Sequence, residues 1–361
     1  MLARRGSRRL IARVNVGVLG CGHAAEMHLR ALARVPRFRV TALADADPVA
    51  AHSLSRHAPG AVVVANASRL FAEAVDIVAV LTPPAVHASN AAAALAAGKD
   101  VVVERPIACT AADADDLAAR ARATGRRVMM AYNFRHHRHV EALRSALASG
   151  ALGRVQALRT LGTTTHDRGR RFARYRRSRA LGGGTLLDFG VAHFDLWRFL
   201  LGDEVTEVTT FSRDDDGDDV TATVTGRMRS GALVTSLFGN RAAEDHTIEI
   251  FGEAGRAAAA LYRADGVRFA TSGAFAGALA SRIDAAVGAV AALPRTLADR
   301  RLGGVYLASY VGLWQAVART VWDGVPAVAT LDDGRRALAI ALAALRSARE
   351  GRSVRVENVD A

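Results

Sequence analysis

The sequence is poor in cysteine and in long apolar runs, and each shortage excludes a class of protein. It has 2 cysteines in 361 residues, Cys21 and Cys109, and neither belongs to a CxxC pair. The sequence therefore argues against a secreted fold held together by disulfides and against a structural zinc site with cysteine ligands. No apolar run approaches the ~20 residues of a membrane span. The arginine-rich start is not followed by the apolar stretch of a signal peptide, so we expect a cytoplasmic protein with no membrane partner.

Lysine is almost absent, because Lys99 is the only lysine among the 48 basic residues. The formal net charge of +13 could indicate a nucleic-acid-binding protein. However, the sequence carries no RRM, KH or zinc-finger signature, and arginine is mixed with aspartate and glutamate over most of its length. A bias toward GC-rich codons accounts for the excess of arginine and alanine. We therefore expect no nucleic-acid partner.

Short apolar runs alternate with helical segments in the first part of the chain. Runs at 14–19, 38–44, 61–65, 75–81, 101–103 and 127–131 show no polar alternation, as expected of strands buried on both faces of a parallel sheet. After about residue 151, apolar and polar residues alternate, most clearly at 220–228, which predicts half-buried antiparallel strands. Because 361 residues exceed an average domain of ~150 residues, we predict an α/β protein with two domains.

The first apolar run ends in a glycine-rich turn that is typical of dinucleotide binding. Gly20, Gly22 and Ala25 form the pattern G-x-G-x-x-A, and helical spacing follows. Such a turn lets the backbone approach a pyrophosphate at a helix N-terminus. Asp45 ends the next run, where a carboxylate accepts bonds from ribose hydroxyls and repels a 2′-phosphate. The pattern predicts an NAD site, with NADP disfavoured; a glycine-rich turn without a ligand is the alternative.

Six motifs occur in one order: 20–25, Thr82-Pro83-Pro84 with His87, Ala97-Gly98-Lys99, Glu104-Arg105-Pro106, Tyr132-Asn133-Phe134-Arg135, and 182–190 with its triple glycine. This series resembles the glucose–fructose oxidoreductase/inositol dehydrogenase/MocA (Gfo/Idh/MocA) family over residues 14–355. The resemblance implies a basic extension at 1–13, a doubly wound Rossmann domain at 14–134 that binds NAD(P), and a C-terminal α/β domain at 135–361. The second domain is expected to have a large open, mostly antiparallel sheet through which homodimers or homotetramers form.

The resemblance also implies which residues touch the cofactor and what the protein does. The expected cofactor residues are Gly20, Gly22, His23, Ala24, Ala25, Asp45, Thr82, Pro83, His87, Glu104 and Asn133. The expected activity is that of an NAD-dependent oxidoreductase, which moves a hydride between nicotinamide and a secondary alcohol or ketone. Its substrate would be a small, sugar- or cyclitol-like molecule.

Two of the three catalytic residues that the family uses are altered. The lysine of Glu-Lys-Pro is Arg105, the histidine four residues after the retained Asp188 is Ala192, and both departures concern proton transfer. Arginine can hold a developing alkoxide, but with a pKa above ~12 it cannot exchange its proton at neutral pH. The alternative function is therefore a non-redox or catalytically altered member, such as a cofactor-binding pathway protein or an NAD-assisted lyase or glycosidase.

Two histidines are candidates to replace the missing imidazole. His193 is five residues from Asp188, about 140° around an α-helix at ~100° per residue, and faces away from it unless the helix is distorted. A structural histidine is the alternative. His166 precedes an arginine-rich run, where a surface histidine is the alternative. The candidate catalytic residues are thus Arg105, Asp188, His193 and His166, and Tyr175 is a further phenolic candidate.

Seven arginines lie between positions 168 and 179, just before the triple glycine. They suggest an anionic substrate, such as a phosphate, a carboxylate or a nucleotide-sugar, held by forked guanidinium contacts. A solvated surface loop is the alternative. His136, His137 and His139 are close in sequence, but no acid or cysteine completes a site, so we predict no metal.

Overall fold

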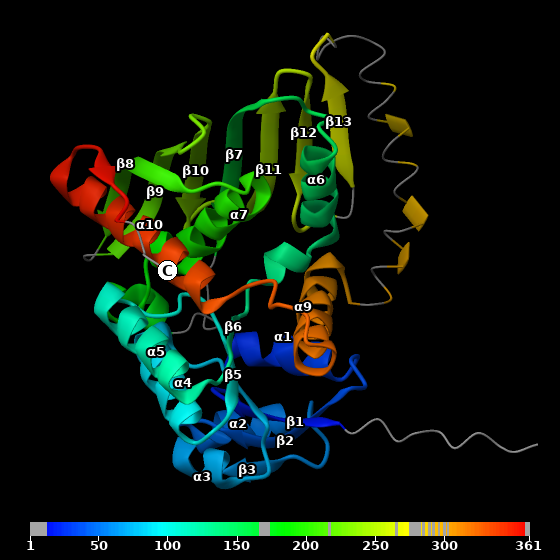
Figure 1. The fold of residues 1–361 in the computed structure, drawn as a ribbon, viewed down its shortest axis with the longest axis vertical. Coiled ribbons are helices and arrows are strands. Elements are labelled where there is room, and N and C mark those ends of the chain that lie inside the picture. The colour runs from blue at the N-terminus through cyan, green and yellow to red at the C-terminus, as the bar shows by residue number, and fades with distance from the viewer. Residues whose placement is uncertain are drawn as a thin grey trace, which may run out of the picture.

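The computed structural model describes residues 13–165, 174–215, 218–263, 266–273 and 303–357, with isolated positions between 283 and 301. His166, most of the basic extension and the first arginines of the 168–179 run lie outside these residues. Two β-sheets occupy opposite ends of the molecule in Figure 1, with helices around them.

The first sheet is parallel and doubly wound, as predicted. Its strand order is β3-β2-β1-β4-β5-β6, so the order reverses between β1 and β4. Every residue of β4 and β5 is buried, which explains why these runs show no polar alternation. The strands are β1 (Val14–Leu19), β2 (Phe38–Ala44), β3 (Val62–Val64), β4 (Ile77–Val80), β5 (Asp100–Val103) and β6 (Val128–Met130). The helices between them are α1 (His23–Leu32), α2 (Pro48–Ser55), α3 (Ala67–Ala72), η1 (Pro84–Val86), α4 (His87–Ala96) and α5 (Ala111–Thr124).

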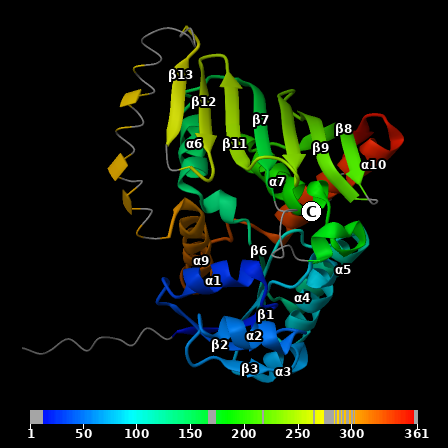
Figure 2. The same cartoon turned by 180° about the vertical axis from the view of Figure 1, so that it is seen from behind.

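The second sheet is larger and mostly antiparallel, which confirms the predicted fold class. Its order is β13-β12-β11-β7-β10-β9-β8-β14, and only the β10–β7 pair is parallel among the pairings described. Helices α6, α7 and α10 cover one face, and the opposite face turns toward the viewer in Figure 2. The strands are β7 (Val155–Thr163), β8 (Val205–Asp215), β9 (Asp218–Met228), β10 (Leu233–Gly239), β11 (Asp245–Gly252), β12 (Gly255–Ala260), β13 (Val267–Thr271) and β14 (Val354–Arg355). The helical elements are η2 (Asn133–His136), α6 (Arg138–Ala148), η3 (Arg174–Arg177), η4 (Arg179–Leu181), η5 (Leu186–Gly190), α7 (Val191–Leu201), α9 (Val305–Asp323) and α10 (Leu331–Glu350).

Helix α9 comes late in the chain but packs beside α1 on the first sheet (Figure 1). Leu313 and Trp314 of α9 share a buried apolar cluster with Val16 and Val18 of β1. Burial of these large side chains holds α9 in place. The helix thereby brings its first turns to the edge of the sheet where the parallel strands end.

A buried ion cluster ties the segment after β6 to the helices of the second sheet. The Arg135 guanidinium donates from Nε to Asp195 Oδ2 at 2.8 Å and from Nη2 to Asp195 Oδ1 at 2.5 Å. Asp333 of α10 lies 2.9 Å from the same Nη2 and 3.2 Å from Nη1 of Arg198. A buried charge must be fully paired to be tolerated, and this bidentate arrangement meets that condition. The cluster fixes α7 and α10 relative to the first sheet.

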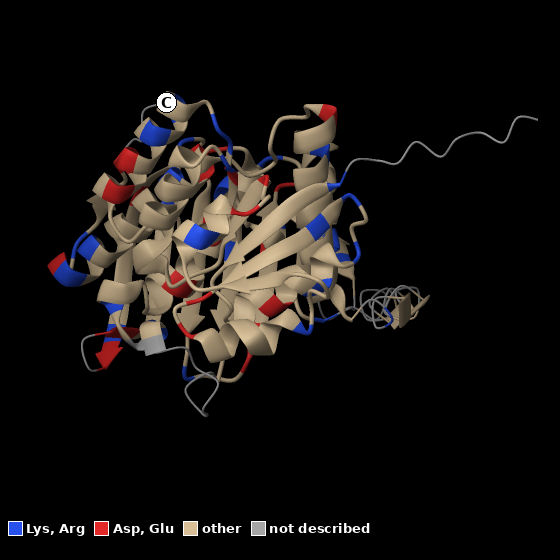
Figure 3. Ribbon diagram, turned by 90° about the horizontal axis from the view of Figure 1, so that it is seen from below, with Lys and Arg blue, Asp and Glu red and all other residues tan. Residues whose placement is uncertain are grey.

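Acidic and basic segments intermingle on the side of the molecule shown in Figure 3. Many arginines pair with neighbouring carboxylates, as Arg227 does with Glu207 across β9 and β8 at 2.9 Å.

Within the described ranges, no helix has the length and apolar character that a membrane crossing requires.

Candidate active site

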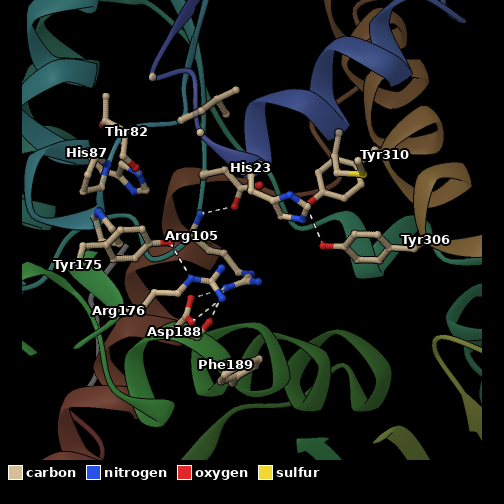
Figure 4. A pocket seen from close by; sticks show the side chains of 18 of the residues that line it. His23, Thr82, His87, Arg105, Tyr175, Arg176, Asp188, Phe189, Tyr306 and Tyr310 are labelled. Carbon is tan, nitrogen blue, oxygen red and sulfur yellow. Dashed lines mark hydrogen bonds and ion pairs between the residues drawn. The ribbon is translucent and has the colours of Figure 1, made fainter. Parts of the chain in front are cut away.

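A cavity of about 520 Å³ opens where the parallel strands end, between the first sheet and the helices of the second (Figure 4). Turns after β1, β2, β4 and β5 form one side, and 175–176, η5 and α9 form the other. Most of the residues predicted from sequence line it: Gly20, Gly22, His23, Ala24, Asp45, Thr82, Pro83, His87, Glu104, Arg105 and Asp188. Ala25 is buried directly behind, in α1.

The glycine-rich turn is shaped for a backbone approach to a ligand. Gly20 has a φ of +98°, and a Cβ there would lie 2.6 Å from backbone atoms of Leu81 and Thr82. A Cβ on Gly22 would instead meet nothing within 4 Å, although Gly22 lines the cavity. No side chain caps the N-terminus of α1 at Gly22. The turn therefore offers room and backbone N–H groups to a pyrophosphate, as NAD requires.

Asp45 closes the far end of the cavity and also fixes the turn. Its Oδ2 accepts a hydrogen bond from the backbone N–H of Cys21 at 2.6 Å, and its Oδ1 accepts one from Asp47 N–H at 2.8 Å. A carboxylate oxygen has two lone pairs, so each of these oxygens can still accept a bond from a ribose hydroxyl. The same charge would repel a 2′-phosphate, which fits NAD better than NADP.

Glu104 is held by a buried chain of hydrogen bonds. Trp314 Nε1–H donates a hydrogen bond to His28 Nδ1 at 3.1 Å. A neutral imidazole with an accepting Nδ1 carries its hydrogen on Nε2, so His28 Nε2–H donates to Glu104 Oε1 at 3.1 Å. Glu104 Oε2 accepts from the backbone N–H of Arg105 at 3.0 Å. Burial raises the pKa of Glu104, but the His28 hydrogen bond and the Arg105 charge outweigh it and leave the pKa below its usual value.

His87 connects two of the turns that form the cavity. Its Nδ1 lies 2.7 Å from the carbonyl oxygen of Pro106, and its Nε2 lies 2.5 Å from that of Thr82. Burial lowers the pKa of His87 below 6.5, although both carbonyls oppose the shift. The imidazole therefore positions the turns after β4 and β5, in addition to lining the cavity.

Arg105 and Asp188 meet at the inner end of the cavity, as the resemblance implies (Figure 4). Arg105 Nη1 donates to the backbone carbonyl of Asp188 and lies 3.7 Å from its Oδ1. Arg176 Nη1 lies 3.3 Å from Asp188 Oδ2, so one carboxylate faces two guanidinium groups. Burial works to lower the pKa of Arg105, but the carboxylates of Glu104 and Asp188 raise it above its ordinary value. Arg105 is thus a permanent cation here.

The triple glycine lets three segments pass close together. A Cβ on Gly182 would lie 2.4 Å from Pro84 Cβ, and one on Gly183 would lie 2.5 Å from the Tyr175 carbonyl oxygen. A Cβ on Gly184 would lie 2.4 Å from Asp219 Oδ1. These contacts bring 175–176 and η5 against the turn after β4, which is how Tyr175 and Arg176 enter the cavity.

His193 does not line the cavity, although the helix before it is distorted. Residues 186–190 form a π-helical turn, which changes the helical register directly before α7. His193 is 1% exposed, its Nε2 faces Gly162 of β7, and neither ring nitrogen has a hydrogen-bond partner among the described residues. Burial and the nearby His246 and Arg105 lower its pKa well below 6.5. The imidazole is therefore neutral and packed in the core; Ala192 beside it is also buried.

Asn133 also lies behind the cavity, where it joins η2 to α9. Its Nδ2 donates to Ser309 Oγ at 2.9 Å, and the side chain is buried.

No group of three or more His, Cys, Asp or Glu side chains in the described part of the chain could hold a metal ion. His137 and His139 instead contact the backbone carbonyl oxygens of Leu261 and Ala260, at 2.7 Å and 2.8 Å.

Several cavity residues are not predicted by the sequence pattern: Met27, Glu244, Tyr262, Tyr306 and Tyr310. Tyr306 and Tyr310 come from α9, and their hydroxyl oxygens lie 3.2 Å apart. Their spacing of four residues places both on one helical face. That spacing is a local signal, but nothing near it in the sequence indicates that α9 returns to the first sheet.

Two glycine variants separate cofactor binding from folding. Gly22→Ala should leave the thermal unfolding midpoint unchanged, because the added methyl group meets open space. The same variant should weaken NADH binding at least about tenfold, because the pyrophosphate would lie in that space. Gly20→Ala should lower the midpoint because its φ is positive and its Cβ would overlap backbone. Fluorescence titration with NADH gives the affinities. Wild-type affinity in Gly22→Ala would contradict this assignment of the turn.

Buried histidines predict loss of stability in mild acid. Burial and the neighbouring His139 lower the pKa of His137 to about 3, from 6.5. Between about pH 6.5 and 3, His137 therefore binds a proton in the unfolded chain but not in the folded chain. The free energy of unfolding falls as the pH falls through this window. His137→Gln should lessen the drop in unfolding midpoint between pH 7.5 and 5.5. The exposed His52→Gln is the control, and an equal change in both variants would refute the assignment.

Comparison with known proteins agrees with this geometry. Residues 14–132 match the Gfo/Idh/MocA oxidoreductase family with an NAD-binding Rossmann fold, and residues 140–258 match the Gfo/Idh/MocA C-terminal domain. Inositol 2-dehydrogenase of Rhizobium meliloti (strain 1021) is 27% identical over 360 residues, which cover 95% of this chain and 99% of that protein.

A further relative and a solved structure are also similar to this chain. The dTDP-3,4-didehydro-2,6-dideoxy-alpha-D-glucose 3-reductase of Streptomyces violaceoruber is 34% identical over 201 residues, or 55% of this chain and 58% of that protein. The structure of GenD2 from gentamicin A biosynthesis, in complex with NAD, superposes with a TM-score of 0.80 and 26% identity over 99% of this chain and 100% of that one. With both halves matched, the chain belongs to the Gfo/Idh/MocA family of NAD-binding oxidoreductases.

Proposed function

We propose that this protein transfers a hydride between nicotinamide and a secondary alcohol or ketone carbon of a sugar- or cyclitol-like substrate. The observation that carries the proposal is the meeting of Arg105 and Asp188 inside the cavity that the glycine-rich turn also lines. The relatives named as inositol dehydrogenase and sugar 3-reductase support this substrate class.

Residues of this chain would hold NAD along the carboxyl edge of the first sheet. The backbone at Gly22 and the start of α1 would bind the pyrophosphate, and Asp45 would accept bonds from the ribose hydroxyls. Glu104, kept ionised by His28 and Arg105, lies at the inner end beside the reacting groups. The bound cofactor supplies or accepts the hydride at its nicotinamide ring.

Arg105 would hold the substrate oxygen. Its side chain is 18% exposed and opens onto the cavity, so its N–H groups can donate to a carbonyl or alkoxide oxygen. Negative charge on that oxygen grows during reduction, and a fixed cation in a dry site stabilises it. Asp188 would act mainly by fixing Arg105, since both its carbonyl and its carboxylate face that guanidinium.

Arg176 extends the site toward a substituent of the substrate. Among the described members of the 168–179 run, it is the arginine that lines this cavity, with its Nε donating to Tyr175 OH at 3.2 Å. A second guanidinium at the substrate end favours substrates that carry a phosphate or carboxylate group. Nucleotide-sugars therefore belong in the substrate screen beside free inositols and sugars.

The activity itself is tested by NADH oxidation with a panel of inosose, keto-sugar and nucleoside-diphosphate keto-sugar substrates. The wild-type chain should oxidise NADH with at least one of them. Arg105→Gln should lose about 10²–10³-fold in kcat, because a donor to the developing alkoxide is removed, with NADH affinity unchanged. A chain that binds NADH and reduces none of the panel would favour a non-redox role.

We also propose that a second copy of the chain covers the outer face of the second sheet. The strand register places Phe211, Leu233 and Leu237 on that face, where they are 76%, 46% and 38% exposed. An exposed apolar patch of this kind on a sheet indicates an interface. Sedimentation velocity should give at least twice the mass of one chain, and Phe211→Asp should shift the protein toward the monomer. A wild-type monomer at micromolar concentration would contradict the proposal.

A further inference from the structure

Proton transfer is the unassigned part of the proposed reaction. Reduction of a ketone needs one proton on the substrate oxygen, and Arg105 keeps its proton because neighbouring carboxylates raise its pKa. His193 is buried outside the cavity. His87 has both ring nitrogens on carbonyl oxygens, and Glu104 has both carboxylate oxygens occupied by hydrogen bonds. The donor must come from the other groups that line the cavity.

The two tyrosines of α9 provide such a donor opposite Asp188 (Figure 4). Tyr306 is half-buried and lines the cavity, while Tyr310 behind it is 3% exposed. Their hydroxyl oxygens are within hydrogen-bond distance at 3.2 Å. The Arg105 charge acts on both hydroxyl groups.

From this placement we propose that Tyr306, supported by Tyr310, is the acid that protonates the substrate oxygen held by Arg105. The inference rests on the proposed function and adds its proton donor and its favoured direction, ketone reduction. Arg105 then only stabilises the negative charge on the substrate oxygen, and Tyr306 donates the proton. A single lysine could perform both roles.

The step balances in atoms and electrons. The carbonyl carbon gains a hydride from the reduced nicotinamide, and the electron pair of the C=O π bond moves onto oxygen. That oxygen takes the proton of the Tyr306 O–H, which leaves a phenolate that the Tyr310 O–H and the Arg105 charge stabilise. Tyr310 donates to the phenolate, and the pair regains one proton from water. Net, one ketone, one NADH and one proton give one alcohol and one NAD.

The electrostatic surroundings of Tyr306 suit an acid more than a base. Burial raises the pKa of Tyr306 above its usual value of 10, while the Tyr310 hydrogen bond and Arg105 limit the increase. The hydroxyl therefore keeps its proton through the neutral range, as a donor for reduction must. Oxidation of an alcohol would need the phenolate and should become appreciable only in alkali.

Tyr175 is a rival donor in the same cavity, which His23 and Tyr262 also line. Its hydroxyl oxygen accepts a hydrogen bond from Arg176 Nε, and the hydroxyl proton could still be donated. Unlike Tyr306, it has no second tyrosine hydroxyl among its described contacts to resupply the proton. The test must therefore include both residues.

The experiment compares tyrosine-to-phenylalanine variants in the NADH-dependent reduction of the panel substrate that the wild type uses. Tyr306→Phe should lower kcat about 10²–10⁴-fold, the usual contribution of general acid catalysis, and leave NADH affinity within twofold. Tyr310→Phe should have a smaller effect. Tyr132→Phe is the matched control, because Tyr132 is buried outside the cavity and its hydroxyl has no partner among the described residues.

The pH profile separates an acid from a structural tyrosine. Wild-type kcat should stay level through neutral pH and fall as the pH rises through the pKa of Tyr306, since the acid is then lost. The fall should disappear in Tyr306→Phe and move to higher pH in Tyr310→Phe, because the Tyr310 hydroxyl lowers the pKa of Tyr306. Tyr306→Phe with kcat within threefold of wild type, or a loss confined to Tyr175→Phe, would overturn the proposal. A wild type that reduces nothing would overturn the proposed function and this inference together.

Discussion

The contact between Arg105 and Asp188 is the interaction on which the site depends. Arg105 follows β5 of the first sheet, and Asp188 lies in the π-helical turn that precedes α7 against the second sheet. Their ion pair and backbone hydrogen bond join the two halves at the inner end of the cavity. Because burial makes an unpaired charge costly, each half needs the other to keep its charged group in place. The cavity is therefore a product of both halves.

The neighbouring contacts make this geometry rigid. The Trp314–His28–Glu104 chain fixes the segment that carries Arg105 from one side, and His87 fixes it from the other through the Pro106 carbonyl. In the proposed reaction, these contacts would let the Arg105 cation meet a developing alkoxide without reorganisation, which is how preorganised charges contribute to catalysis.

The sequence predicts which turn residues gather at the cavity because these signals are local. Gly20, Gly22 and Asp45 follow strands whose burial is evident from uninterrupted apolar runs, and parallel strands bring their ends to one edge. Arg105 and Asp188 were predicted by motif order, and the cavity contains both. The predicted fold class is confirmed for both sheets.

The substrate half was harder to predict because it depends on contacts distant in sequence. Tyr306 and Tyr310 reach the cavity because Leu313 and Trp314 of the same helix share a buried apolar cluster with β1, almost three hundred residues earlier in the chain. His193 lies in the core because Gly162 leaves space for its ring, a pairing that no sequence spacing reveals. His166 lies outside the described residues and remains a prediction from sequence.

If one cavity holds cofactor and substrate together, a hydride passes directly from the nicotinamide to the substrate carbon. The most direct measurement is the fate of deuterium from NADH labelled at the transferring C4 position, followed by mass spectrometry of the products. We expect one deuterium on the carbon that bears the new hydroxyl group. Bound NADH that keeps its label with every ketone offered, or label that appears only in water, would contradict it.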